Sequence, residues 1–208
     1  MKESADMDGW RMGIEADPIR RFEAALAAAR AVDRAIIPDA TAFALATVDT
    51  LGYPAVRIVL LKGVDERGFV FYTNYESRKG RELLASPQAA LCFHWAPLEV
   101  QVRVEGRVVP VSAAEADAYF ATRARGSQIG AWASIQSRPL DRYATLEDRV
   151  ESFTREFEGR EVPRPPHWSG FRVVPERIEF WKGRANRLHE RHVYTRREGE
   201  WAVEMLYP

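Results

Sequence analysis

Short apolar runs follow one another closely between residues 43 and 73. Phe43–Val48, Ala55–Lys62 and Gly68–Thr73 are rich in apolar, β-branched and aromatic residues, and glycines mark the turns between them. Two neighbouring parallel strands need a crossover of about a dozen residues or more, and these connections are much shorter. The sequence therefore predicts an antiparallel meander and argues against a doubly wound parallel sheet.

The rest of the chain alternates helical and strand patterns. Asp17 followed by Pro18 is typical of a helix start, and an alanine-rich stretch continues to Val32. Many antiparallel strands with helices between them predict an α+β protein built on an antiparallel β-barrel with peripheral helices. The further expected helices are Ser77–Ala85, Ala113–Thr122, Gln128–Ser134 and Leu146–Phe157, and the further strands are Ala89–Trp95, Leu98–Val109, Gly170–Val174, Arg177–Trp181, His189–Thr195 and Trp201–Leu206.

Length and charge restrict the class of protein. The 208 residues suit a single domain over residues 17–208, with residues 1–16 expected to form a mobile arm. The arm is polar and acidic, no apolar run approaches the ~20 residues of a membrane helix, and Cys92 is the single cysteine. We therefore expect a cytoplasmic protein with no membrane partner. The formal net charge is zero, which argues against a general nucleic-acid surface.

The segment Ser77–Lys79 lies at the start of an expected helix. A serine hydroxyl, two basic side chains and free backbone N–H groups form a phosphate site at such a position. A capped helix with two solvated bases explains the same residues. Basic residues in a first turn oppose the helix dipole, which favours a bound anion.

Arg57 and Lys62 bracket the apolar run Ile58–Leu61. Such a run is expected to be buried on both faces, with its charged ends at a sheet edge or cleft. The two cations are five residues apart, so in a regular strand they point to opposite faces. Joint contact with one ligand therefore requires a bulge or the end of the strand, and a strand with ordinary polar ends remains the alternative.

Basic side chains also recur at Arg187, His189 and Arg191. If this segment is extended, the three lie on one face and repel one another unless an anion or an electron-rich ring lies beside them. Trp181, just upstream, offers an aromatic wall. An exposed basic strand edge paired with carboxylates is the alternative.

The chain shows no pattern for metal or nucleophilic catalysis. The four histidines have no metal-ligand spacing, one cysteine cannot form a thiolate site, and there is no Gly-x-Ser-x-Gly elbow. The fingerprint Gly-x-Gly-x-x-Gly is absent as well. Anion-binding clusters without a nucleophile or metal indicate a phosphorylated cofactor that carries the chemistry itself.

Five ordered blocks resemble the pyridoxamine 5'-phosphate oxidase family. They are Arg57–Lys62, Phe71–Asn74, Ser77–Lys79, Ser127–Ser134 with Gln136 and Ser137, and Ile178–Trp181 followed by Arg187–Arg191. The resemblance runs from about Asp17 to Pro208. It implies a split β-barrel that binds flavin mononucleotide (FMN) and works as a homodimer, with two flavin sites at the interface.

The resemblance also implies site residues, position by position. The residues expected to hold FMN are Arg57, Ile58, Val59, Leu60, Leu61, Lys62, Tyr72, Thr73, Ser77, Arg78, Lys79, Gln101, Gln136, Ser137, Trp181 and Arg191. Those expected to hold the substrate are Lys62, Tyr119, Arg123, Ser127, Arg187 and His189, with Tyr119, Arg123 and Ser127 around its phosphate. Arg187 and His189 are the expected catalytic pair. Tyr119 and Arg123 are one helical turn apart, so a helix places them on one face.

The implied reaction is oxidation of pyridoxamine 5'-phosphate, and of pyridoxine 5'-phosphate, to pyridoxal 5'-phosphate with oxygen as acceptor and hydrogen peroxide as product. Two alternatives remain: a related flavin oxidase acting on another ring, as in phenazine biosynthesis, and a non-catalytic FMN or pyridoxal phosphate binding protein. The chain departs from the family pattern in residues 1–16, which lack the usual Arg-x-x-Tyr segment, and at Val100 and Lys182.

Overall fold

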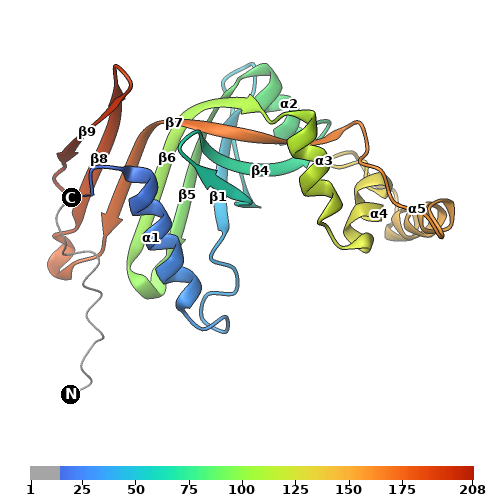
Figure 1. The fold of residues 1–208 in the computed structure, drawn as a ribbon, viewed down its shortest axis with the longest axis horizontal. Coiled ribbons are helices and arrows are strands. Elements are labelled where there is room, and N and C mark those ends of the chain that lie inside the picture. Colours follow the sequence, from blue (N-terminus) through green and yellow to red (C-terminus); the bar gives the residue numbers. More distant parts are fainter. Residues whose placement is uncertain (1–14) are drawn as a thin grey trace.

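The computed structural model describes residues 15–208 (Figure 1). The expected arm, residues 1–16, therefore lies outside the described residues except for Glu15 and Ala16. A strongly curled antiparallel sheet runs through the molecule. Helix α1 lies across one face of the sheet, and α3, α4 and α5 gather at one end (Figure 1). The α+β prediction is confirmed.

The elements follow the expected order with small shifts at their ends. The helices are α1 (Pro18–Ala31), α2 (Arg78–Ala85), α3 (Ala113–Ala121), α4 (Arg125–Ala133) and α5 (Tyr143–Glu156). The strands are β1 (Ala42–Val48), β2 (Pro54–Leu60), β3 (Gly63–Asp65), β4 (Gly68–Asn74), β5 (Gln88–Trp95), β6 (Val100–Pro110), β7 (Trp168–Lys182), β8 (Glu190–Arg197) and β9 (Glu200–Met205).

The nine strands form one sheet. Its order is β2-β1-β5-β6-β7-β4-β3, and β8 and β9 continue from the carboxyl half of β7. Every pairing is antiparallel, as the short connections predicted. The short strand β3 was not predicted, because three residues beginning at a glycine give no periodic pattern.

The prediction of two strands at Gly170–Val174 and Arg177–Trp181 was wrong. They are one strand of 15 residues, β7, which pairs with β4 in its first half and with β8 in its second. Pro175 lies between the two predicted segments, and proline donates no ladder hydrogen bond. The sheet absorbs it with a register shift at Glu105 and Gly106 of β6. A Cβ on Gly106 would meet the Val174 carbonyl oxygen at 2.1 Å, so only glycine fits at this shift.

The main core lies between α1 and the sheet. The Asp17 side chain caps α1 by accepting from the Ile19 backbone N–H at 2.9 Å. This orients Phe22, whose ring packs edge-on against Phe69 at 4.8 Å and Phe93 at 4.9 Å. A smaller core forms under α3, α4 and α5 and contains Phe120, Ile129, Phe157, Val162 and Trp168.

Strand β2 is exposed on one side, which contradicts the expectation that its apolar run is buried on both faces. It is the edge strand of the sheet, and Val56 and Ile58 are 69% and 67% exposed. Ala44 and Ala46 of β1 lie beside Ile58 and Val56 in the register. The first strands of the sheet therefore present a row of apolar and small side chains to the outside.

A buried histidine joins α1 to β8. Nδ1 of His192 lies 2.9 Å from Nη2 of Arg21, and because arginine only donates, this imidazole nitrogen accepts. Tyr194 accepts a second hydrogen bond from Arg21 at 3.0 Å. Burial, together with the Arg21 charge, lowers the pKa of His192 despite the nearby Glu190. The contact therefore requires a neutral imidazole.

This contact predicts a pH-dependent stability. Because the pKa of His192 is lowered in the folded state, its contribution is complete above the ordinary histidine pKa of about 6.5 and is lost as the pH falls through the lower folded value. The melting temperature of the flavin-free protein should fall from pH 7 towards pH 5, and His192→Gln should flatten this slope. Melting curves on both proteins, with His94→Gln as an exposed control, measure it. Identical slopes in parent and His192→Gln would contradict the assignment.

Candidate active site

A cavity of about 450 Å³ lies between the edge of the sheet and helices α3 and α4. Several of the residues expected to bind ligands line it together. They are Ile58, Val59, Leu60, Lys62, Tyr72, Thr73, Lys79, Tyr119, Arg123, Ser127 and Gln136, accompanied by Asn74, Gly130, Ala131, Ser134 and Trp168. Lys62 joins them because β2 ends at Leu60, so the chain has left the strand before it. Arg57, inside the strand, does not line the cavity.

Three stacked aromatic rings form one wall of the cavity. The Tyr72 ring lies parallel to Tyr119 at 4.0 Å and to Trp168 at 5.4 Å between centroids. Burial, with the charge of Glu115 and the nearby Tyr119, raises the pKa of Tyr72 to about 12. Its phenol is therefore protonated at neutral pH. Trp168 was missed by the sequence reasoning, because a single aromatic residue before a strand looks like an ordinary core residue.

Arg123 lies at one end of the cavity, in surroundings that are unfavourable for its positive charge. Its guanidinium carbon is 4.7 Å from the centre of the Trp168 ring, and burial lowers the pKa of the side chain. Its Nη1 atom is buried and has no hydrogen-bond partner within residues 15–208. Arg123 is half-buried, and a buried N–H donor without a partner is costly, so this end of the cavity favours an anion.

The residues around Arg123 complete this end. The expected helix face shared by Tyr119 and Arg123 was wrong in detail: α3 ends at Ala121, and Arg123 follows in a turn closed by its N–H to the Phe120 carbonyl at 3.1 Å. Both side chains nevertheless line the cavity. Ser127 lies in the first turn of α4, where Ala124 provides no side-chain cap. The start of α4 therefore leaves backbone N–H groups available beside Arg123.

Lys79 marks a second cationic region of the same cavity. Its Nζ lies 2.9 Å from Oε1 of Gln136 and 3.2 Å from Oγ1 of Thr73. Burial and the Arg57 charge lower the pKa of Lys79. Ser77 is fully buried and caps α2, since its Oγ accepts from the Gly80 N–H and donates to the Asn74 carbonyl. Ser137, next to Gln136, has a left-handed φ of 67°.

Arg57 and Arg78 meet at a buried carboxylate, Glu82. Arg57 donates from Nη2 to Oε2 of Glu82 at 3.0 Å, and Arg78 donates from Nε to Oε1 at 2.7 Å. Arg78 is thus part of an ion pair on its own helix, whereas the capped-helix alternative expected a solvated base. Burial acts to raise the pKa of Glu82, and hydrogen bonds from Thr47, Arg78 and Arg57 outweigh it and lower the pKa.

The expected basic face of Arg187, His189 and Arg191 does not form, because the segment is not extended. Residues Ala185–Arg187 make a single 3-10 turn, and Asn186 and Arg187 have left-handed φ values of 56° and 62°. Strand β8 begins only at Glu190. The expected aromatic wall is confirmed, since the His189 ring lies 4.6 Å from the Trp181 ring. Arg187 itself is exposed.

Arg191 is held at two points. Its Nε donates to Oε1 of buried Glu179 at 2.8 Å, and its Nη1 donates to the Tyr207 carbonyl at 2.9 Å. The hydrogen bond and charge of Glu179 raise the pKa of Arg191. Glu179 also accepts from Arg103 and Arg177. Like Glu82 on α2, this buried carboxylate of β7 has no sequence signal that separates it from a surface residue.

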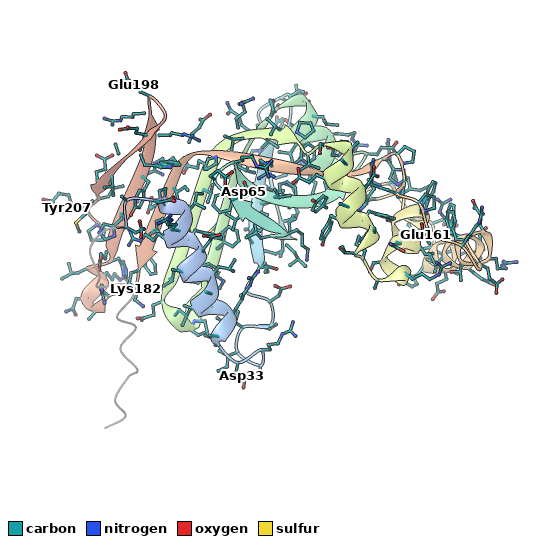
Figure 2. The ribbon with its side chains drawn as sticks, viewed as in Figure 1. Asp33, Asp65, Glu161, Lys182, Glu198 and Tyr207 are labelled. Carbon is teal, nitrogen blue, oxygen red and sulfur yellow. The ribbon has the colours of Figure 1, made fainter. Side chains whose placement is uncertain are left out.

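The expected site residues thus form two groups within one chain. Gln101, Trp181, Arg187, His189 and Arg191 do not line the cavity. Figure 2 shows Lys182 and Tyr207 on the side of β8 and β9, and Glu161 at the opposite end, beside α4 and α5. One chain therefore does not bring all of the expected site residues into one place.

Comparison with known families and structures agrees with this architecture. Residues 30–157 match the family model described as pyridoxamine 5'-phosphate oxidase. Residues 168–208 match the model described as the pyridoxine 5'-phosphate oxidase C-terminal dimerisation region, which supports a homodimer. Within residues 15–208, no helix is long and apolar enough to cross a membrane.

Curated relatives are similar over nearly the whole chain. A pyridoxine/pyridoxamine 5'-phosphate oxidase of Myxococcus xanthus is 59% identical over 198 residues, covering 95% of both chains. One of Paraburkholderia phytofirmans is 54% identical over 197 residues, covering 94% of this chain and 91% of the relative.

Solved structures place the fold in the same group. PhzG from Burkholderia lata, in complex with tetrahydrophenazine-1-carboxylic acid, superposes with a TM-score of 0.86 at 28% identity, over 99% of this chain and 98% of that one. A pyridoxamine 5'-phosphate oxidase-related FMN binding protein from Nostoc punctiforme shares the fold with a TM-score of 0.72 at 18% identity, over 94% of this chain and 100% of that one. The expected antiparallel split barrel with peripheral helices is confirmed. The chain belongs to the pyridoxamine 5'-phosphate oxidase family.

Proposed function

We propose that this chain is an FMN-dependent oxidase that converts pyridoxamine 5'-phosphate, and pyridoxine 5'-phosphate, to pyridoxal 5'-phosphate, reducing oxygen to hydrogen peroxide. The observation that carries the proposal is the pair of separate cationic regions in one cavity, around Lys79 and around Arg123. Two phosphorylated molecules, a cofactor and a substrate, account for both regions. The names of the curated relatives support the same reaction.

The residues around Lys79 fit the phosphate of FMN. The half-buried ammonium of Lys79, the Thr73 hydroxyl and the Gln136 amide supply donors within a short distance of one another. Burial and the Arg57 charge lower the pKa of Lys79, and the negative charge of a bound phosphate would act in the opposite direction. The cations of Arg57 and Arg78 lie behind this group and add to its positive field.

The residues around Arg123 fit the phosphate of the substrate. Arg123 would use its unpartnered Nη1, Ser127 its hydroxyl, and α4 the free N–H groups of its first turn. The protonated phenol of Tyr72 and the ring of Tyr119 border the space between the two phosphates. Fixing the substrate by its phosphate orients its reacting carbon and replaces water in the cavity.

When bound, FMN supplies the redox chemistry, by accepting a hydride from the aminomethyl or hydroxymethyl carbon of the substrate and passing the electrons to oxygen. The chain provides position and charge. Arg187 and His189 are proposed to hold the substrate ring from its other side, and Trp181, Gln101 and Arg191 to hold the flavin. None of these five residues lines the cavity of its own chain.

A second copy of the chain would complete each site. The apolar row on β2 includes Ile58 and Leu60, which also line the cavity, so the cavity opens at the edge of this row. Exposed apolar rows of this kind are typical of interfaces. We propose that two chains pair over this row, and that Trp181, Arg187, His189 and Arg191 of one copy reach the cavity of the other.

A steady-state assay tests the function. Purified protein loaded with FMN should form pyridoxal 5'-phosphate and peroxide in equal amounts from pyridoxamine 5'-phosphate and oxygen. A reduced phenazine carboxylate serves as the competing substrate, since the PhzG structure contains such a ring system. Oxidation of the phenazine alone would favour the alternative enzyme, and flavin binding without turnover of either would favour a binding protein.

Variants of Arg187 and Arg191 separate the proposed roles of these two residues. Arg187→Ala should leave FMN affinity unchanged and lower kcat/KM for pyridoxamine 5'-phosphate by about one to two decades, because one oriented cation is lost from the substrate site. Arg191→Ala should raise the dissociation constant of FMN, and excess FMN should restore part of the activity. His189→Ala should act like Arg187→Ala but more mildly.

The measurements are a flavin titration and a peroxide-coupled assay on each variant. Arg196→Ala, an exposed arginine on the same strand as Arg191, is the matched control. Loss of flavin in Arg187→Ala, with Arg191→Ala unchanged, would reverse the assignment.

A further inference from the structure

Glu82 is a buried carboxylate that no binding motif of the chain includes. It lies on α2, four residues after Arg78, and only 6% of it is exposed. Its two oxygens accept from three side chains: Oε1 from Arg78, and Oε2 from Arg57 and from the Thr47 hydroxyl. Thr47 in turn accepts from Nη1 of Arg57. The carboxylate therefore fixes both guanidinium groups relative to the start of α2.

Glu82 also acts electrostatically on the region around Lys79. The Arg57 charge lowers the pKa of Lys79, whereas the Glu82 charge acts in the opposite direction. Three cations and one carboxylate thus share one part of the molecule. Because Glu82 is buried, solvent and salt screen its charge weakly. A phosphate group that binds here gains from the cations and loses from Glu82.

We infer that Glu82 is the counter-ion that holds Arg57 and Arg78 in place in the flavin-free protein, and that its charge limits how tightly the phosphate of FMN binds. This inference rests on the proposed FMN site. Without flavin, Glu82 prevents the repulsion of three neighbouring cations and stabilises the fold. With flavin, the phosphate takes over part of that neutralisation and is repelled by Glu82.

Glu82→Gln tests the inference, because glutamine keeps the size and one acceptor oxygen but removes the charge. The dissociation constant of FMN should fall by about tenfold, because one weakly screened negative charge is removed from the neighbourhood of the proposed phosphate site. The dissociation constant of riboflavin, which lacks the phosphate, should stay unchanged. The flavin-free variant should melt several degrees lower than the parent, and FMN should raise its melting temperature by more.

Two controls make the result specific. Glu76→Gln makes the same change of charge at an exposed position just before α2, and should alter FMN affinity by less than about twofold, because solvent screens it. A double variant covers the case in which Glu82→Gln alone does not fold. Arg57→Met alone should weaken FMN binding, and adding Glu82→Gln should recover about tenfold, since the buried pair is then removed together.

Several outcomes overturn the inference. Unchanged FMN binding in Glu82→Gln would mean that the carboxylate charge does not limit phosphate binding. Weaker binding would mean that holding Arg57 and Arg78 in place outweighs any repulsion of the phosphate. Equal tightening of FMN and riboflavin would mean that its charge does not act on the phosphate. If adding Glu82→Gln to Arg57→Met recovers no FMN affinity, the Glu82 charge likewise does not act on the phosphate. If the parent protein binds no FMN at all, the proposed function fails instead, and flavin titration of the parent distinguishes the two cases.

Discussion

Arg123→Ala should lower kcat/KM for pyridoxamine 5'-phosphate by about two to three decades while leaving FMN affinity unchanged. Arg123 lines the cavity and is assigned to the substrate phosphate, whereas Lys79 is assigned to the FMN phosphate. The Nη1 atom of Arg123 is a buried donor without a partner in residues 15–208. Removing one side of a desolvated charge pair typically costs about 2–5 kcal/mol. The loss should appear in KM more than in kcat, because the phosphate contact persists from ground state to transition state.

The matched control for Arg123→Ala is a second substrate, pyridoxamine, which lacks the phosphate group. Pyridoxamine without its phosphate is a poor substrate under this account, and Arg123→Ala should reduce its turnover by less than about threefold. Arg123→Lys should recover part of the lost activity, since it restores charge without the planar stacking on Trp168. An equal loss for the phosphorylated and unphosphorylated amines would show that Arg123 supports the fold rather than the phosphate.

Replacing both Arg78 and Lys79 with alanine should raise the dissociation constant of FMN by about two to three decades. Each charge-assisted phosphate contact contributes about 1.5–3 kcal/mol. Lys79 should account for most of the effect, because it lines the cavity, whereas Arg78 is 59% exposed and already paired with Glu82. Flavin fluorescence titration measures the change, with riboflavin as the ligand that should respond little.

Arg81→Ala is the control for the double variant, since it removes an exposed cation from the same helix. It should bind FMN like the parent. The circular dichroism of the double variant should also match the parent, because Ser77 still caps α2. An unchanged dissociation constant in the double variant would leave Ser77–Lys79 as a capped helix with two bases, and would remove the phosphate site from the account.

Local patterns gave the elements of the fold. The cap at Asp17, the alternation along β6 and the short turns of the first strands each depend on neighbouring residues, and each prediction was confirmed. The single strand β7 was not predicted, because Pro175 is tolerated only through a register shift in another strand, β6. Whether a segment that contains a proline forms one strand or two depends on its pairing with distant strands. A single sequence does not show that pairing.

The family blocks predicted a set of site residues, and several of these line one cavity, but the geometry of the others was not predicted. Alternation placed Arg187, His189 and Arg191 on one face, whereas two left-handed residues turn the chain before β8. Asn tolerates that conformation and arginine rarely adopts it, so no residue type at position 187 indicated the turn. The buried partners Glu82 and Glu179 were missed, since their burial depends on arginines from other strands.

An anaerobic single-turnover experiment shows whether the bound flavin oxidises pyridoxamine 5'-phosphate. Protein loaded with FMN is mixed, without oxygen, with one equivalent of pyridoxamine 5'-phosphate, and the visible absorbance of the oxidised flavin is followed together with the aldehyde product. We expect the absorbance to disappear as one pyridoxal 5'-phosphate forms for each flavin, and oxygen to restore it with release of peroxide. Pyridoxamine without phosphate should react far more slowly. A flavin that stays oxidised in the presence of saturating pyridoxamine 5'-phosphate would contradict the assignment of this chain as an oxidase of that substrate.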